Sequence, residues 1–469
     1  MTTSNDHDGV LSRHLMLVTG TAALGGFLFG YDSSIINGTV DAVRAQFGLS
    51  AAGIGFTVSC ALLGAMLGAW YAGVCSERIG RVRTMVIAAV LLGVSAIGSG
   101  MAFGAYDLII WRAIGGIGIG FASVIAPAYI AEVSPSGNRG RLGSLQQMAI
   151  VTGIFLSLLV SALLARFAGG AAGMLGGYAA WRWMFLSELV PAIAYGVLAL
   201  RLPESPRFLV EKNREPEASA VLRDVVGVPA AQVAAKITTI RETVNAEERK
   251  SFKDLLGGSF YFLPIVWIGI ILSVFQQFVG INVIFYYSTT LWQSVGFQES
   301  DSFMISVFMS IVNIAATFIA IALIDSMGRR KLLLGGSALM AIALAVMALA
   351  FSYSVTIDGA VSLPSPWGVV ALIAANVFIL GFAASWGPAV WVLLGEIFPN
   401  RIRGMALGLA GAAQWLANFV VSTTFPILAG IGLDFAYSLY ALFAFLSLVF
   451  VWRGLKETKG MTLEDMGKR

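Results

Sequence analysis

Two short stretches of the sequence, "SERIGR" at 76–81 and "DSMGRR" at 325–330, share an acidic residue, a glycine and an arginine in the same order. The spacing between counterparts is 248 positions, and it relates Glu77, Gly80 and Arg81 to Asp325, Gly328 and Arg329. A second pair, "AEVSPSGNRGR" at 131–141 and "GEIFPNRIRG" at 395–404, repeats at a spacing of 264 and relates Glu132, Arg139 and Gly140 to Glu396, Arg403 and Gly404. The chain is therefore predicted to contain two halves that repeat in parallel.

The sequence around these repeats is strongly hydrophobic. Of its 469 residues, 58% are hydrophobic and 12% are charged, and the mean hydropathy is +0.82. Each apolar segment is about 20 residues or longer, which is enough to cross a bilayer as a helix. The predicted fold is an all-α membrane protein with twelve transmembrane helices, at 15–36, 54–75, 84–103, 107–130, 142–166, 181–201, 261–292, 303–324, 332–353, 367–395, 405–430 and 433–452.

The long polar stretch in the middle of the chain divides these spans into six and six. We expect an N-terminal half at 1–201, a cytoplasmic linker with short helices at 202–258, a C-terminal half at 259–454 and a tail at 455–469. Placing both termini in the cytoplasm puts 26 of the 30 Lys and Arg residues on that side, as the positive-inside rule requires. Two like-oriented halves of six helices are typical of transporters whose halves rock around a site at the bilayer midplane.

Composition also argues against other classes of protein. The basic residues are spread over short loops and do not form one patch, so no nucleic-acid partner is expected. The cysteines, Cys60 and Cys75, lie in one span, and the histidines, His7 and His14, lie at the N-terminus. Their positions give no cluster with the spacing of metal ligands, and we expect neither a metal nor a cofactor. The sequence also lacks a nucleophile, base and orienting residue that would indicate an enzyme.

The motifs that surround the spans are specific. They include "GYD" at 30–32, "WRAIGGIGIG" at 111–120, "PESPRFL" at 203–209, "QQFVGINVIFYY" at 276–287 and "SWGPAVWVLLGEIFPNRIRG" at 385–404. With the repeated loops, they resemble the sugar porter family of the major facilitator superfamily, and most of all its bacterial proton-coupled glucose and hexose permeases. The resemblance implies a sugar symporter of the plasma membrane that works by alternating access, and we expect a monomer with sugar, proton and lipid bilayer as its partners.

Amide side chains both donate and accept hydrogen bonds, as sugar hydroxyls do. Gln276 and Gln277 lie within two helical turns of Asn282, so at least one of these glutamines can share a lining with it. The resemblance implies further sugar-contact or pocket-lining residues, namely Gln147, Asn313, Trp391, Gln414, Trp415 and Asn418. Ile154 matches hexose carriers of the family. The alternative interpretation is that these amides join helices to one another.

Asp32 follows an apolar run, where a charge costs about 2.5–3.5 kcal/mol on insertion scales and needs a partner. Arg112, on the fourth span, is the predicted partner, and the pair is a candidate proton switch; a fixed ion pair that braces the half is the alternative. Glu188 is a second intramembrane carboxylate that either assists coupling or pairs with a polar neighbour. Tyr286 and Tyr287 either gate the sugar site or anchor the helix at the interface.

The charges of the repeated loops form the last candidate group. As a network that spans both halves, they can hold one state of the transporter and break in the other. The predicted gating residues are Glu77, Arg81, Glu132, Arg139, Glu204, Arg207, Asp325, Arg329, Glu396 and Arg403. Solvated loops without such a role are the alternative, since single surface ion pairs contribute only ~0–1 kcal/mol. A passive sugar uniporter, a pentose or polyol symporter and a sugar sensor are the alternative functions.

Overall fold

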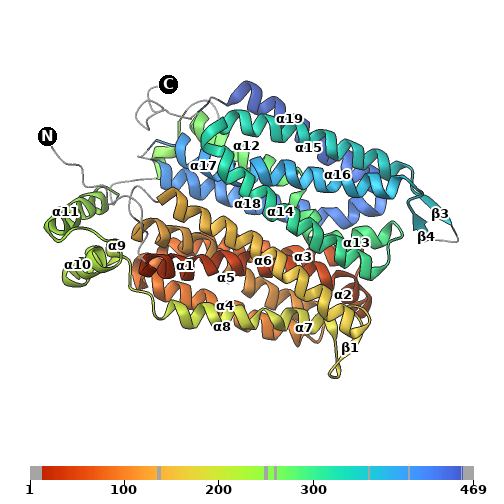
Figure 1. Cartoon of the computed structure of the whole chain (residues 1–469), viewed down its shortest axis with the longest axis horizontal. Coiled ribbons are helices and arrows are strands. Elements are labelled where there is room, and N and C mark those ends of the chain that lie inside the picture. Colours follow the sequence, from red (N-terminus) through yellow and green to blue (C-terminus); the bar gives the residue numbers. More distant parts are fainter. Residues whose placement is uncertain are drawn as a thin grey trace.

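The computed structural model describes residues 13–134, 139–247, 252–257, 261–357, 360–399, 402–455 and 457, most of which lie in helices. The long helices run side by side in two bundles, which are the lower and upper parts of Figure 1. One end of both bundles carries α2 (Val40–Phe47) and two small β-hairpins, and we call it the hairpin end. The opposite end carries α9 (Pro206–Glu211), α10 (Glu215–Asp224) and α11 (Ala230–Glu247), and we call it the linker end.

The first bundle is built from residues before the linker. Its remaining elements are α1 (Arg13–Ile35), the 3-10 turn η1 (Ile36–Thr39), α3 (Ala51–Ile79), α4 (Arg81–Gly100), α5 (Ala105–Val133), α6 (Arg139–Ala168), the antiparallel hairpin of β1 (Met174–Leu175) and β2 (Tyr178–Ala179), α7 (Ala180–Ser187) and α8 (Leu189–Ala199).

The second bundle follows the linker and the 3-10 turn η3 (Phe252–Leu255). It contains α12 (Pro264–Phe278), α13 (Ile281–Ser294), α14 (Glu299–Met327), α15 (Arg329–Ser352), the antiparallel hairpin of β3 (Val355–Ile357) and β4 (Ala360–Ser362), α16 (Trp367–Gly381), the π-helical turn η4 (Phe382–Trp386), α17 (Gly387–Ile397), α18 (Arg403–Ile431) and α19 (Leu433–Gly454). The bundles meet where α3 packs on α18 and α6 packs on α14.

Three predicted spans are interrupted. The span at 181–201 is divided into α7 and α8, because Pro191 has no N–H to donate to the carbonyl of Ser187. The span at 261–292 is divided at Gly280, whose φ of +84° favours glycine. The span at 367–395 contains the wide turn η4, a feature that is frequent at functional sites.

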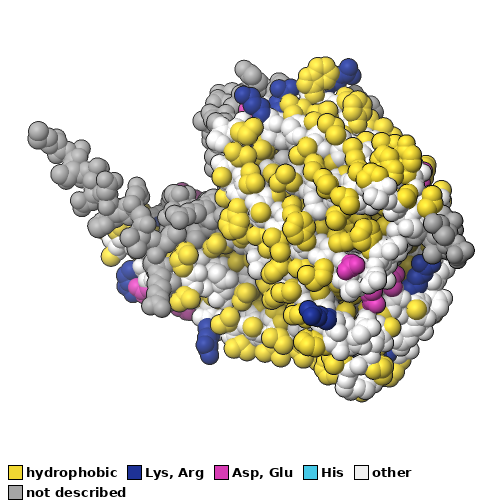
Figure 2. Space-filling model, turned by 45° about the vertical axis from the view of Figure 1, so that its right-hand side comes forward, with side chains coloured by type: hydrophobic (Ala, Val, Ile, Leu, Met, Phe, Trp, Pro, Cys, Tyr) yellow, Lys and Arg dark blue, Asp and Glu magenta, His cyan; other side chains and the backbone are white. Residues whose placement is uncertain are grey.

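Within the described residues, eleven helical segments are long and apolar enough to cross a membrane. The predicted sixth span is the one missing from this set, because α7 has only 8 residues and α8 only 11. The outer surface agrees with a membrane setting: Trp70 is 67% exposed and Tyr106 is 86% exposed, and in Figure 2 hydrophobic side chains are spread over the face with few charged ones among them. The chain is a multi-pass membrane protein of the predicted all-α class.

Glycines allow the helices of the first bundle to approach closely. A Cβ on Gly116 of α5 would lie 2.0 Å from the carbonyl oxygen of Ala61 on α3, and one on Gly120 would lie 2.3 Å from that of Ala65. The contact between α1 and α6 is equally close, since a Cβ on Gly30 would lie 2.0 Å from the carbonyl oxygen of Ile150. The glycine-rich stretch at 113–122 therefore serves helix packing, as small residues do in membranes.

Candidate functional site

A buried ionic group lies inside the first bundle. Arg112 Nη1 on α5 donates to Asp32 Oδ1 on α1 at 2.7 Å, and Asp32, Arg112 and Glu188 are 0%, 2% and 1% exposed. Glu188 is close enough to interact electrostatically with both. Asp32 Oδ2 and Glu188 Oε1 are buried without a hydrogen-bond partner among the described residues. The group thus holds one cation, two carboxyls and two unpaired acceptor atoms.

The break between α7 and α8 positions this group. Glu188 is the residue between the two helices, and Tyr31, the neighbour of Asp32, forms a 2.7 Å hydrogen bond with the Ser187 hydroxyl. The Arg112 guanidinium lies over the Phe185 ring, 5.7 Å from its centroid. These contacts fix the three ionisable side chains on α1, α5 and the α7–α8 junction without contact with bulk water.

Amide side chains form a second group, in the second bundle. Asn282 Nδ2 donates to Gln277 Oε1 at 2.6 Å across the break at Gly280, between the end of α12 and the start of α13. Gln276 Nε2 donates to the carbonyl oxygen of Trp386 at 2.9 Å, at the wide turn η4. Gln277 Nε2 also lies 3.5 Å from Gln276 Oε1, so the three amides lie next to one another.

A further polar group lies where α13 meets α18. Pro426 has no N–H for the carbonyl of Ser422, and the Tyr287 hydroxyl donates to that carbonyl at 2.8 Å. Ser422 Oγ donates to Asn418 Oδ1 at 3.1 Å, and Asn418 Nδ2 donates to the Tyr286 hydroxyl at 3.4 Å. Tyr286, Tyr287 and Asn418 are thus interior residues of one hydrogen-bonded chain.

The other predicted sugar-site residues have varied surroundings. Trp415 on α18 packs edge-on against Phe29 of α1, with ring centroids 5.5 Å apart, and so joins the two bundles. Gln414 Oε1 is buried without a hydrogen-bond partner in the described part of the chain. Asn313 is buried and Gln147 is half-buried, whereas Trp391 is 45% exposed.

The two bundles are joined by hydrogen bonds at the hairpin end. Thr289 of α13 donates through its N–H and hydroxyl to Asn37 Oδ1 of η1, at 3.0 and 2.7 Å. Thr290 Oγ1 donates to Asp41 Oδ2 at 2.9 Å, and the N–H of Ala171 donates to Glu299 Oε1 at 2.8 Å. We call these contacts the hairpin-end closure.

Helix packing supports the same closure. A Cβ on Gly55 of α3 would lie 2.3 Å from the carbonyl oxygen of Thr423 on α18, and the hydroxyls of Ser59 and Thr423 are 2.6 Å apart. None of the closure residues was predicted from the sequence to join the bundles. Asn37 and Gly38, a polar residue and a small residue beside an apolar span, are the signal from which it could have been suspected.

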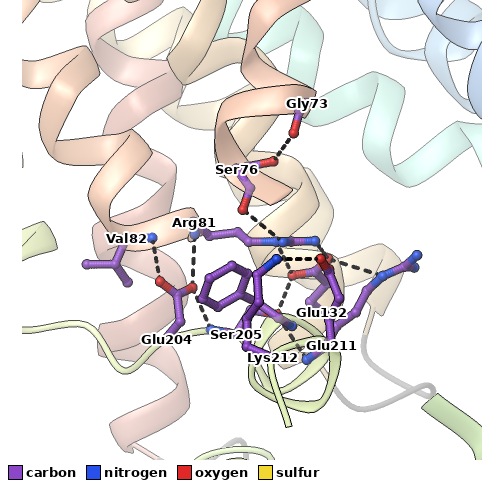
Figure 3. A network of polar contacts seen from close by, with 11 residues as sticks. Gly73, Ser76, Arg81, Val82, Glu132, Glu204, Ser205, Glu211 and Lys212 are labelled. Carbon is purple, nitrogen blue, oxygen red and sulfur yellow. Dashed lines mark hydrogen bonds and ion pairs between the residues drawn. The ribbon is translucent and has the colours of Figure 1, made fainter. Parts of the chain in front are cut away.

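Charged residues form a network at the linker end of the first bundle (Figure 3). Arg81 donates from Nε and Nη2 to the two carboxylate oxygens of Glu132, at 3.1 and 2.9 Å, and from Nη1 to the carbonyl of Ser76 at 3.1 Å. Glu204 accepts from the N–H groups of Arg81 and Val82 at 3.0 and 3.3 Å, so its charge caps α4. The Ser205 hydroxyl also donates to Glu132.

The second bundle repeats this network. Arg329 Nη2 donates to Glu396 Oε1 at 2.9 Å and Nη1 donates to the carbonyl of Ile324 at 3.1 Å. Glu457 accepts from the N–H groups of Arg329 and Arg330 at 2.9 and 3.1 Å, and so caps α15 as Glu204 caps α4. Glu457 was not among the predicted gating residues, although "KETKG" at 456–460 follows the last span as "PESPRFL" follows the sixth.

Arg81 and Glu132 both belong to the first bundle, and Arg329 and Glu396 both belong to the second. In this conformation neither pair therefore joins the two halves. Arg207 Nε lies 4.0 Å from Glu132, Arg403 Nε donates to the carbonyl of Phe398 at 3.2 Å, and Glu77 is exposed. The side chains of Arg139 and Asp325 fall outside those that the structure describes.

We expect Glu204→Ala to lower the melting temperature. The substitution leaves the N–H groups of Arg81, Val82 and Ser205 without their acceptor. Losing a capping side chain costs about 1–2 kcal/mol, which corresponds to roughly 1–2 °C in a chain of 469 residues. Thermal unfolding of the purified protein measures the shift. Glu217→Ala on α10, whose exposed carboxylate pairs only with Arg214 in the described residues, is the matched control and should leave the melting temperature unchanged.

Comparison with known proteins places this arrangement in a family. The family described as "Sugar (and other) transporter" matches residues 18–469. The glucose transport protein of Synechocystis is 51% identical over 457 residues, and the match covers 97% of each chain. The D-xylose-proton symporter of Escherichia coli K12 is 36% identical, with 97% of this chain and 95% of the symporter covered. A partially occluded inward open structure of the E. coli xylose transporter XylE has a TM-score of 0.83 at 35% identity, over 96% of this chain and 100% of that one.

Proposed function

Because this chain belongs to the sugar transporter family and is a transporter and not an enzyme, we propose that it is a proton-coupled symporter of glucose or a similar hexose. The buried Asp32–Arg112 pair carries the proposal of proton coupling, since a carboxylate in a membrane bundle needs a partner or a use. The name of the 51% identical relative supports glucose, and the name of the 36% identical relative supports symport with protons.

The amide groups are the proposed sugar site. Gln276, Gln277 and Asn282 present donors and acceptors on one side, and Asn418 presents another amide beside the Tyr286 hydroxyl. Trp415 and Trp391 offer aromatic faces on which the C–H groups of a pyranose can stack. Gln147, Asn313 and Gln414 complete the proposed lining; the unpartnered oxygen of Gln414 suits a sugar hydroxyl as its donor.

We expect Gln277→Ala to weaken hexose binding about fivefold or more, because one direct hydrogen bond contributes ~1 kcal/mol. Isothermal titration calorimetry of the purified variant measures the dissociation constant. Gln298→Ala is the matched control, since Gln298 is exposed at the start of α14 and its side chain makes no capping hydrogen bond. If Gln277→Ala lowers thermal stability and leaves the dissociation constant unchanged, the amide joins helices and does not contact sugar.

Proton coupling is assigned to the ionic group. With both carboxyls ionised the group carries a net charge of −1, and one added proton makes it neutral. The unpartnered Asp32 Oδ2 and Glu188 Oε1 are the proposed sites of that proton. In this scheme Asp32 is the proton carrier, Arg112 sets its affinity for the proton and Glu188 assists.

The hairpin-end closure supports an assignment of the conformation. We propose that the hairpin end faces the outside of the plasma membrane and the linker end, with both termini, faces the cytoplasm, and that the transporter functions as a monomer. The structure is then an inward-facing state, in which Tyr286 and Tyr287 belong to the closed outer gate. The charge networks at the linker end are proposed to exchange partners between bundles when the transporter turns outward.

Sugar uptake into proteoliposomes, with and without a pH gradient, tests the proposal over a panel of hexoses, pentoses and polyols. A symporter accumulates its sugar only when the gradient is present. Uptake that equilibrates equally fast without a gradient identifies a uniporter, and preference for another sugar corrects the substrate.

A further inference from the structure

A basic pocket lies at the linker end of the first bundle, apart from the sugar and proton groups. It is a cavity of about 290 Å³ between the end of α3, the start of α4 and the helix α9 with its flanking residues. Four cations line it, Arg78, Arg83, Lys212 and Arg214, against one carboxylate, Glu204. Apolar side chains that include Val82, Leu202 and Phe208 form the rest of the lining.

The one carboxylate that lines the pocket does not balance the charge of its four cations. Lys212 pairs with Glu211 at 3.0 Å and Arg214 pairs with Glu217 at 2.6 Å. Arg78 and Arg83, in contrast, have no hydrogen bond or ion pair in the described part of the chain. Glu204 accepts hydrogen bonds from the backbone at the start of α4 and is therefore already used (Figure 3).

The shape and position of the pocket indicate the ligand. A guanidinium presents a planar fork of N–H donors that matches the oxygens of a phosphate, and two such groups are available here. The pocket lies where α3, a candidate membrane span, ends and directly after α8, which corresponds to the depth of the lipid headgroups. Basic pockets between transmembrane helices bind anionic headgroups, and the apolar lining suits the first methylene groups of the acyl chains.

We propose that this pocket binds a phosphate group, carried by the headgroup of an anionic phospholipid. The phosphate contacts Arg78 and Arg83 from α3 and α4, and Lys212 and Arg214 complete the site from the linker. Because Glu204 and Phe208 line the pocket and also contact Arg81, a bound phosphate lies directly against the charge network of the first bundle.

Native mass spectrometry of the purified full chain tests the site. The protein is incubated with phosphatidylglycerol, with phosphatidylcholine, or with inorganic phosphate alone, and the bound fraction is measured against ligand concentration. We expect phosphatidylglycerol to bind in preference to phosphatidylcholine, and Arg78→Gln/Arg83→Gln to weaken its binding at least about tenfold.

The second bundle provides the matched control. The repeat of 248 positions places Lys331 where Arg83 lies, and Arg453 is a further exposed cation at the linker end. Lys331→Gln/Arg453→Gln therefore removes the same charge from the same end of the protein and leaves the pocket intact.

The outcomes separate the sources of the phosphate. Binding of inorganic phosphate that depends on Arg78 and Arg83, without retention of phosphatidylglycerol, upholds the phosphate site and identifies a free anion as its ligand. If both double variants lose phosphatidylglycerol binding to the same extent, or if neither double variant changes it, the proposed site is wrong. Since the readout is binding of phosphate and not sugar uptake, the result does not depend on the proposed transport function.

Discussion

Asp32→Asn is expected to abolish sugar accumulation while sugar exchange continues. Moving one proton inward releases about 2.3 kcal/mol per 100 mV, which supports roughly fiftyfold accumulation at one-to-one coupling. Asparagine at position 32 still accepts a hydrogen bond from Arg112 but cannot release a proton, so the accumulation ratio falls to about 1. Uptake against a gradient and counterflow of labelled sugar, both in proteoliposomes, measure the two activities.

Asp301→Asn is the control for this experiment. Asp301 is an exposed carboxylate in the first turn of α14 at the hairpin end, away from the ionic group. Its substitution removes the same charge and should leave the accumulation ratio unchanged. If the Asp32 variant accumulates sugar like the unmodified protein, the Asp32–Arg112 pair is a brace for the first bundle and the proton binds elsewhere.

The parts of the fold that depend on local sequence were predictable. Apolar length located the spans, and the repeated loops at 76–81 and 325–330 predicted that the two halves repeat. The expected charge network was one that spans both halves, whereas the pairs of Arg81 with Glu132 and of Arg329 with Glu396 each lie inside one half. The contact of Asp32 with Arg112 was predicted correctly because an unpaired charge in a membrane helix costs free energy, so each needs a partner.

Contacts between elements that lie far apart in the sequence were harder to predict. Hydropathy cannot show that Pro191 divides the sixth span, since it reports apolar length and not the backbone hydrogen bond that a proline removes. The hydrogen bond of Thr289 with Asn37 depends on how the bundles meet, and the polar Asn37 beside an apolar span does not indicate which residue of the other half it contacts. Glu457 was missed for a related reason: "KETKG" follows the last span as "PESPRFL" follows the sixth, but the contact of its glutamate with the start of α15 requires α19 to lie beside α15.

The close contact of α3 with α18 gives the second large effect. We expect Gly55→Leu to reduce transport to the level of empty liposomes, because any side chain here meets the backbone carbonyl of Thr423, which cannot rotate away. The hairpin-end closure then cannot form, and a transporter that works by rocking its halves is held open at that end. Initial sugar uptake in proteoliposomes measures the loss, and calorimetry is expected to show that sugar binding persists.

A second glycine of the same helix, Gly73, provides the control for this prediction. Gly73 has no atom within 4 Å of the position that a Cβ would occupy, so Gly73→Leu adds the same side chain to α3 without meeting the other bundle. Both variants gain the same helix propensity and apolar surface, and only Gly55→Leu obstructs the closure. Cysteines placed at Asn37 and Thr289 report the state directly: we expect them to cross-link in the Gly73→Leu protein and not in the Gly55→Leu protein. Full transport by Gly55→Leu, with cross-linking retained, would show that the bundles separate and close without the approach of α3 to α18.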